Sequence, residues 1–157
     1  MTTTIEKFYT AFQQLDAESM VACYHDDIEF NDPAFGTLKG EDAKDMWRML
    51  CMNGKNLKLE VSGVEQNNNT GKAHWEAHYL FSATGRNVHN IIDATFELKD
   101  GLIIKHHDHF NLKSWAGQAL GIKGRLLGGT KFFKKKLHAQ TNANLRKFQA
   151  AQQKKRS

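Results

Sequence analysis

The spacing of apolar residues changes once along this chain, near residue 57, and this change constrains the fold more than any other feature. Before residue 57, apolar side chains recur at helical spacing. After it, apolar and polar residues alternate up to about residue 110, which is typical of strands with one buried face. Helices followed by strands predict an α+β domain with helices on one face of a sheet.

The first part predicts three helices. Asp16 would cap a short second helix, and Gly40 leads into a third that ends at Asn53-Gly54. The first and third helices have these apolar faces: Ile5, Phe8, Tyr9, Phe12 and Leu15, and Ala43, Met46, Trp47, Leu50 and Cys51. We expect Cys23 and Cys51 to be buried free thiols, which suits a reducing cytoplasm.

The second part predicts four long strands joined by tight turns. Turn-forming residues occur at 67–71, 84–87 and 100–101, and alternating segments lie between and around them. Such short connections make neighbouring strands antiparallel. The sequence therefore predicts a curved antiparallel sheet wrapped around the N-terminal helices, within a domain at residues 1–115.

Residues 116–157 differ in composition from the first domain. They predict a connection with several glycines, followed by one long basic helix over roughly residues 130–153. Every Asp and Glu lies at or before Asp108, so residues 109–157 carry 12 basic side chains and no acidic one. The helix has an apolar seam at Phe133, Leu137, Thr141, Leu145 and Phe148. Packing on its own domain is the favoured prediction. Contact with nucleic acid or with an anionic membrane surface is an alternative that is not favoured.

The segment at residues 28–36 lies between two predicted helices and contains the chain's only proline. A short strand, Ile28–Asn31, delivers the Asp32 carboxylate to a turn fixed by Pro33. Apolar surroundings would raise the pKa of Asp32 toward the range of a general base. The other interpretation is a turn residue whose carboxylate accepts hydrogen bonds from nearby backbone amides.

The last predicted strand carries His106 and Asp108 on one face. They would form an acid/base pair in which the carboxylate orients the imidazole, or a buried structural hydrogen bond. His107 and His109 share the opposite face, but no spacing signals a third ligand, so we predict no metal site and no cofactor.

A large apolar cavity is expected where the helices meet the sheet, and it would suit a flat hydrophobic ligand. The alternative is that the same aromatic side chains simply fill the core. Asn90 is the informative member, because an amide on an apolar strand face needs a hydrogen-bond partner. The candidate ligand-binding residues are Phe8, Phe12, Trp47, Trp75, Tyr79 and Asn90.

Several short stretches together resemble the SnoaL-like branch of the nuclear transport factor 2-like superfamily over residues 5–115. They are Phe8-Tyr-Thr-Ala-Phe12, Tyr24-His-Asp-Asp27, Asp32-Pro-Ala-Phe-Gly36, Met46-Trp47, Trp75-Glu-Ala-His-Tyr-Leu-Phe81, Gly85-Arg-Asn-Val-His-Asn90 and His106-His-Asp-His-Phe110. The resemblance implies an α+β cone and a homodimer formed through the open face of the sheet. The superfamily contains both enzymes and binding proteins, so the resemblance implies no single activity.

Ketosteroid isomerase has the same cone, and its base lies in a segment similar to Asn31-Asp32-Pro33. The resemblance therefore implies that Asp32 occupies the base position. The oxyanion donors do not carry over, because the tyrosine falls on Phe8 and the protonated aspartate falls near Ile92, which counts against steroid isomerisation. SnoaL-like cyclases and related hydrolases use Asp and His residues inside the cone, which here match Asp108 and His106.

Two functions follow from these observations. The first is a cofactor-free enzyme of isomerase, cyclase or hydrolase type that binds a small hydrophobic molecule and uses Asp32 with His106 and Asp108. The second is a non-catalytic ligand-binding or protein-interaction module that acts through the cone mouth and the basic helix. We expect a cytoplasmic homodimer in either case.

Overall fold

The computed structural model describes residues 2–156 of the chain. Helices occupy α1 (Thr4–Gln13), α2 (Ala17–Val21), α3 (Glu41–Asn53), α4 (Leu112–Leu120), α5 (Ile122–Leu127) and α6 (Lys131–Arg156). Strands occupy β1 (Tyr24–Asp32), β2 (Gly36–Lys39), β3 (Lys58–Gln66), β4 (Thr70–Phe81), β5 (Arg86–Lys99) and β6 (Leu102–His109). The α+β class predicted from the change in apolar spacing is confirmed.

Within residues 2–156 the strands form one six-stranded sheet in the order β2-β1-β6-β5-β4-β3. The four long strands β3 to β6 pair antiparallel, as predicted. The sheet as a whole is mixed, because β1 lies parallel to β6. Parallel pairing arises here because the segments between β1 and β6 return the chain to the end of the sheet where β1 begins, so β6 starts there too.

Two details at β1 differ from the sequence prediction. The strand begins at Tyr24 and not at Ile28, and it extends to Asp32. A short strand β2, which was not predicted, forms a hairpin with β1 and pairs Asp32 with Gly36. Four residues are too few for an alternation to be recognised in the sequence.

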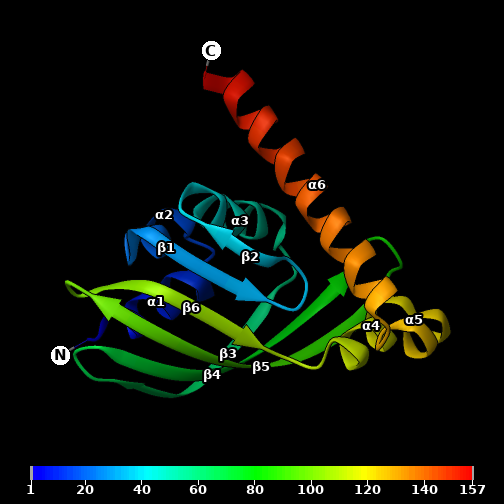
Figure 1. The fold of residues 1–157 in the computed structure, drawn as a ribbon, viewed down its shortest axis with the longest axis horizontal. Helices are drawn as coiled ribbons and strands as arrows, with labels where there is room; N and C mark the ends of the chain where they lie inside the picture. Colours follow the sequence, from blue (N-terminus) through cyan, green and yellow to red (C-terminus); the bar gives the residue numbers. More distant parts are fainter. Residues whose placement is uncertain (1, 157) are drawn as a thin grey trace.

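Figure 1 shows α1, α2 and α3 on one face of the curved sheet, while α4 and α5 lie at one end of it. From that end α6 runs past α3, and its C-terminal part extends beyond the body of the protein. The inner face of the sheet is apolar in strict alternation, most clearly along β5, where every second residue from Val88 to Leu98 is buried. This alternation confirms the predicted strand parity.

The core lies between that face and the helices. Ile5, Phe8 and Phe12 of α1 are all buried against it. Cys23 and Cys51 are buried and free, as expected. No helix within residues 2–156 combines the length and the apolar character that crossing a membrane would require.

The apolar seam of α6 packs on the protein's own core, which confirms the favoured prediction for this helix. Leu145 is fully buried, and Phe148 is partly buried against the main core. Phe133 and Leu137 contact a second cluster, which is built around Trp115 of α4 and Val88 of β5. The basic side chains occupy the remaining faces of α6.

The buried position of Leu145 gives a first prediction. Leu145→Ala should lower the free energy of unfolding by about 2–5 kcal/mol, because it removes apolar atoms and leaves a cavity between α6 and the core. Urea unfolding followed by circular dichroism measures this loss. Leu126→Ala is the matched control, because the Leu126 side chain is exposed and its truncation should change the unfolding free energy by less than about 0.5 kcal/mol. Equal stability of the two variants would show that α6 does not pack on the core in solution.

Candidate active site

Asp32 ends β1 at the hairpin to β2. Its Oδ1 accepts hydrogen bonds from the backbone amides of Ala34 at 2.9 Å and Phe35 at 2.7 Å. Pro33, which follows Asp32 directly, has no backbone N–H, so the amides of the next two residues supply the donors. The other oxygen, Oδ2, accepts no hydrogen bond from any residue within 2–156. The turn interpretation therefore holds for one oxygen and leaves the second one available.

The surroundings of Asp32 favour its protonated form. The residue is half-buried, and its carboxyl group is largely surrounded by protein atoms. This burial is the largest cause of a pKa raised to about 7. The amides of Phe35 and Ala34 oppose the rise, while the negative charge of Asp108 adds to it. Near neutral pH the carboxyl group is therefore divided between its acid and base forms, as a general base or acid requires.

His106 and Asp108 lie on β6, with side chains that are almost completely buried. His106 Nε2 lies 2.9 Å from Asp108 Oδ1, and His106 Nδ1 lies 2.7 Å from the Tyr24 hydroxyl. The indole Nε1 of Trp47 donates to the Tyr24 oxygen at 2.8 Å, so the Tyr24 hydroxyl proton is free to bond Nδ1. The imidazole proton then lies on Nε2 and is donated to the Asp108 carboxylate.

The strand register brings Asp32 and Asp108 together. In the parallel pair of β1 and β6, Phe30 lies opposite His106 and Asn31 opposite His107. The next step in this register places Asp32 beside Asp108 on the inner face. Both carboxyl groups that the sequence singled out therefore lie in one largely buried region, where the charge of Asp108 acts on Asp32.

The aromatic candidates fill much of the cone themselves. Trp47 packs against Phe8 and Phe12 with ring centroids 5.5 and 5.1 Å apart, and Phe12 lies 5.4 Å from the ring of Trp75. All four side chains are buried. These four aromatic side chains, which were predicted to line a large cavity, thus pack against one another in the core, as the alternative interpretation expected.

Tyr79 and Asn90 lie on adjacent strands, β4 and β5, at the end of the sheet near α4. The Tyr79 oxygen accepts a hydrogen bond of 2.7 Å from Trp115 Nε1 of α4. Burial raises the pKa of the Tyr79 hydroxyl, and the charge of Asp32 adds to the rise, so the two groups lie within electrostatic reach. The Asn90 side chain is about nine-tenths buried and has no hydrogen-bond partner within residues 2–156. The sequence predicted that this amide needs a partner; no protein group supplies one, and its polar atoms keep some contact with solvent.

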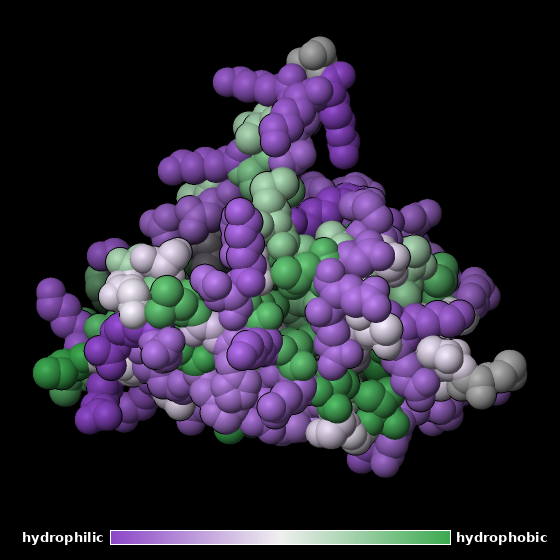
Figure 2. Space-filling view, turned by 180° about the vertical axis from the view of Figure 1, so that it is seen from behind, coloured by the Kyte–Doolittle hydropathy of each residue, from purple (hydrophilic) through white to green (hydrophobic). Residues whose placement is uncertain are grey.

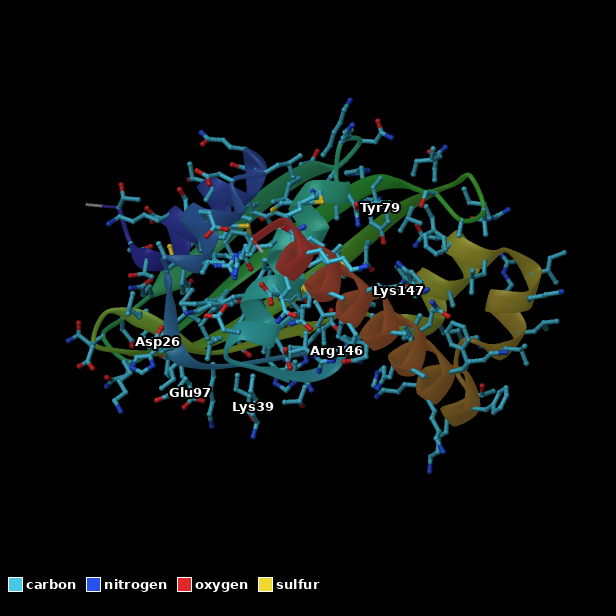
Figure 3. All side chains as sticks on the ribbon, turned by 90° about the horizontal axis from the view of Figure 1, so that it is seen from above. Asp26, Lys39, Tyr79, Glu97, Arg146 and Lys147 are labelled. Carbon is cyan, nitrogen blue, oxygen red and sulfur yellow. The ribbon has the colours of Figure 1, made fainter. Side chains whose placement is uncertain are left out.

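Helix α6 lies across the Asp32 turn. His138 Nε2 donates to the Pro33 carbonyl at 2.8 Å, Thr141 Oγ1 to the Ala34 carbonyl at 2.9 Å, and Asn142 Nδ2 to the Phe35 carbonyl at 3.1 Å. We call these three side chains the α6 clasp. Figure 3 looks down on α6 and shows it crossing over the sheet. The clasp was not predicted, because nothing local in the sequence links residues more than one hundred positions apart.

Gly36 shows how closely α6 approaches the turn. Its φ is +75°, and an added Cβ would lie 3.2 Å from Nδ1 of His138. Gly36→Ala should therefore lower the unfolding free energy by about 1–2 kcal/mol from backbone strain alone, and by more because the His138 ring must shift. Gly85→Ala is the control, because Gly85 has φ of +71° but open space around it. Unfolding curves that show the same loss for both variants would mean that His138 does not contact the turn.

The outer face of the sheet carries a separate polar cluster. Glu76 accepts hydrogen bonds from His89 Nε2 at 2.7 Å and from His74 Nε2 at 2.9 Å. His74 also contacts Asp93, and this contact is the larger cause of a raised pKa of the imidazole. Ligand atoms of Glu76, His78 and His89 lie within 4.8 Å of one another.

This cluster is poorly arranged for a metal ion. The rings of His78 and His89 stack with centroids 4.0 Å apart and planes 20° apart. An ion bound to imidazole lies in the plane of the ring, so one ion cannot bind both rings unless one of them turns. Both oxygens of Glu76 are already hydrogen-bonded to histidines. On the same outer face, His107 Nε2 is hydrogen-bonded to Asn31 Oδ1 at 2.7 Å.

Sequence reasoning missed two tyrosines of the site. Tyr24 joins His106 to Trp47, and the Tyr9 hydroxyl is buried without any hydrogen-bond partner among residues 2–156. The charge of Asp108 adds to the burial that raises the pKa of Tyr9, so this hydroxyl also faces the buried carboxylate region. For Tyr9 the signal in the sequence was a tyrosine on the apolar face of the first helix, whereas Tyr24 lies on a part of β1 that was not predicted as strand.

The sequence profile of the SnoaL-like domain family matches residues 5–106. No curated protein matches the chain significantly. Among solved structures, a nuclear transport factor 2-like protein of unknown function from Cytophaga hutchinsonii is similar, with a TM-score of 0.59 and 23% identity. The similarity covers 71% of this chain and 99% of that one.

Two further solved structures are similar in fold. A putative polyketide cyclase from Xanthomonas campestris has a TM-score of 0.60 and 17% identity, over 74% of this chain and 93% of its own. An LEH-like epoxide hydrolase from M. tuberculosis has a TM-score of 0.58 and 20% identity, over 80% of this chain and 88% of its own. At these identities the similarity concerns the fold.

Proposed function

Because this chain belongs to the SnoaL-like domain family, we propose that it is an enzyme that carries out general acid–base chemistry on a small hydrophobic molecule. The observation that supports this proposal most directly is Asp32. Its carboxyl group has one oxygen fixed by two amides, one oxygen without a protein partner, and a pKa raised to about 7. That combination suits a group that must take up and return a proton at neutral pH.

In the proposed reaction, Asp32 Oδ2 removes a proton from the carbon next to a carbonyl group, or from a water molecule that attacks an epoxide. The same carboxyl group then returns a proton to the product. Tyr79 and Asn90 are candidates to hydrogen-bond the substrate oxygen, since the charge of Asp32 acts on Tyr79 and the Asn90 amide has no protein partner. Polyketide-like substrates, carbonyl compounds and epoxides are the classes that fit, as the names of the similar structures suggest.

His106 has a different role in this proposal. Both of its ring nitrogens are hydrogen-bonded inside the protein, to Tyr24 and to Asp108, so no nitrogen is left for a substrate. We assign His106 as a positioning residue that holds the Asp108 carboxylate in place near Asp32. The charge of Asp108 then helps to keep a proton on Asp32, in the way that neighbouring carboxyl groups raise one another's affinity for protons.

The substrate would occupy the outer part of the cone. The deeper part is filled by aromatic rings, whereas Asp32, Tyr79 and Asn90 lie toward the end covered by α4 and α6. Entry would require the α6 clasp to release the turn, because the clasp binds the three carbonyls next to Asp32.

The test is a turnover screen. Purified protein is incubated with hydrophobic ketones, epoxides and polyketide-like compounds, and products are followed by chromatography and mass spectrometry. We expect one of these classes to be converted by the natural chain and not by Asp32→Asn. Conversion by both proteins at the same rate would remove Asp32 as the base and the proposal with it.

A further inference from the structure

Helix α5 exposes its large apolar side chains to solvent and buries a glycine. It packs on α4 through glycine: Gly124 is buried, and an added Cβ there would clash with the backbone carbonyl of Ala116. Its large apolar side chains face away from the protein, with Ile122 exposed by 77%, Leu126 by 73% and Leu127 by 50%. A helix that stabilised only its own fold would turn these side chains inward.

Phe132, in the first turn of α6 a few residues further along the chain, is exposed by 71%. We call Ile122, Leu126, Leu127 and Phe132 the α5 patch. The other large hydrophobic side chains exposed within residues 2–156 are Met52, Leu80 and Ile91, which come from three different elements. Figure 2 shows hydrophobic side chains among hydrophilic ones at its left end, where α4 and α5 lie in this view. Exposed hydrophobic side chains that lie this close together in the chain are typical of an interaction site.

Positive charge surrounds the α5 patch. The basic residues of α5 and of the first turns of α6 are Lys123, Arg125, Lys131, Lys134, Lys135 and Lys136. No acidic residue occurs after Asp108 to neutralise them. The Nζ atom of Lys136 lies 6.0 Å from the centre of the Phe132 ring, so charge and apolar surface are in direct contact there.

A groove next to α5 is lined by basic side chains. It has a volume of about 450 Å³ and lies between α4, α5 and the start of β5. Arg86, Lys113 and Arg125 line it together with polar side chains, and no carboxylate does. Arg86 donates Nε to the Gln118 carbonyl at 2.8 Å, whereas Lys113 and Arg125 form no ion pair within residues 2–156. Three cations around one groove fit the phosphate group of a lipid.

We propose that this surface docks on an anionic lipid bilayer, with the α5 patch in the headgroup region and the groove cations on lipid phosphates. Aliphatic side chains gain nothing from the backbone of a nucleic acid but are stabilised among acyl chains, while the lysines attract an anionic surface. A second copy of this chain would bring the same positive charge against itself, which opposes pairing through this face.

The test uses the full chain and sedimentation with vesicles at low salt. One set of vesicles is phosphatidylcholine alone, and the other is an equal mixture of phosphatidylcholine and phosphatidylglycerol. We expect binding to the mixed vesicles, weak binding to phosphatidylcholine, and release by salt. Leu126→Ser with Phe132→Ser should weaken binding to mixed vesicles by about tenfold or more, because two inserted side chains are lost.

Charge variants and matched controls separate the two parts of the surface. Lys113→Glu with Arg125→Glu should also weaken binding by about tenfold or more. Ile91→Ser removes an equally apolar side chain, 53% exposed on the outer sheet face, and Lys58→Glu with Lys72→Glu makes the same change in net charge on β3 and β4. These controls should bind mixed vesicles nearly as well as the natural chain does.

Three results would overturn the proposal. The first is no binding to the mixed vesicles at low salt. The second is a dimer, measured by analytical ultracentrifugation without lipid, that Leu126→Ser with Phe132→Ser converts to a monomer, because a second copy would then cover the patch. The third is binding to anionic vesicles that these two substitutions leave unchanged, or that inorganic phosphate abolishes while sodium chloride of equal ionic strength does not.

Discussion

Asp32→Asn should lower turnover by about a hundredfold or more, because an amide cannot accept a proton from the substrate. The fold should survive, since the amide oxygen can still accept the hydrogen bonds from Ala34 and Phe35. The measurement is kcat/KM on whichever substrate class the screen identifies. Asp27→Asn is the matched control, because Asp27 lies on the same strand but is exposed, and its replacement should leave kcat/KM unchanged.

The same substitution should change how stability depends on pH. The folded-state pKa of Asp32 is raised from 3.8 to about 7, so between these values the folded protein holds a proton that the unfolded chain has released. The free energy of unfolding of the natural chain should therefore fall as pH rises through this window, by up to about 4 kcal/mol from this group. Asp32→Asn lacks this loss, so it should gain stability relative to the natural chain from pH 4 to pH 7. A difference that stays constant over this range would contradict a raised pKa at Asp32.

His106→Ala should lower the free energy of unfolding by about 3–5 kcal/mol, the second large effect that we expect. The imidazole packs among Phe30 and Phe96 with ring centroids 5.1 and 4.4 Å away, so its removal leaves a cavity. It also leaves the buried Asp108 carboxylate with only a 3.4 Å contact to Trp75. An ionised group without its partner is costly in a protein interior, so the loss should be larger than that of apolar packing alone.

Urea unfolding at neutral pH measures this loss, and a double-mutant cycle identifies its source. His106→Ala with Asp108→Ala should lose less than the sum of the two single variants, because removal of the carboxylate removes the buried charge. His107→Ala is the control, since His107 lies next in the strand on the outer face and bonds only Asn31. A loss in His106→Ala no larger than in His107→Ala, or strict additivity in the cycle, would contradict a buried pair.

Part of the site was predictable because side chains along β1, β5 and β6 alternate between the two faces of the sheet. A two-residue alternation fixes which side chains share a face, so Asp32, Asn90, His106 and Asp108 all point inward as expected from the sequence. At Asp32 the hydrogen bonds of the turn interpretation involve one carboxylate oxygen only, so the turn role leaves the other oxygen without a protein partner.

Other features depend on contacts that no local pattern encodes. Tyr24 reaches His106 across the parallel pair of strands, and parallel pairing is decided by the whole topology. The α6 clasp joins the Asp32 turn to side chains more than one hundred positions later. The sequence also shows the apolar residues of α5, but their outward direction is set by the close approach of Gly124 to α4.

The central claim is that Asp32 exchanges a proton near neutral pH, and carbon-13 NMR of labelled aspartate carboxyl groups tests it most directly. Asp32→Asn identifies the signal, which is then followed across a pH titration. We predict a midpoint near pH 7 for Asp32 in the natural chain, and a lower midpoint in Asp108→Asn, where the neighbouring negative charge is absent. A midpoint near 4, the ordinary value for an exposed aspartate, would contradict the role of Asp32 as the base.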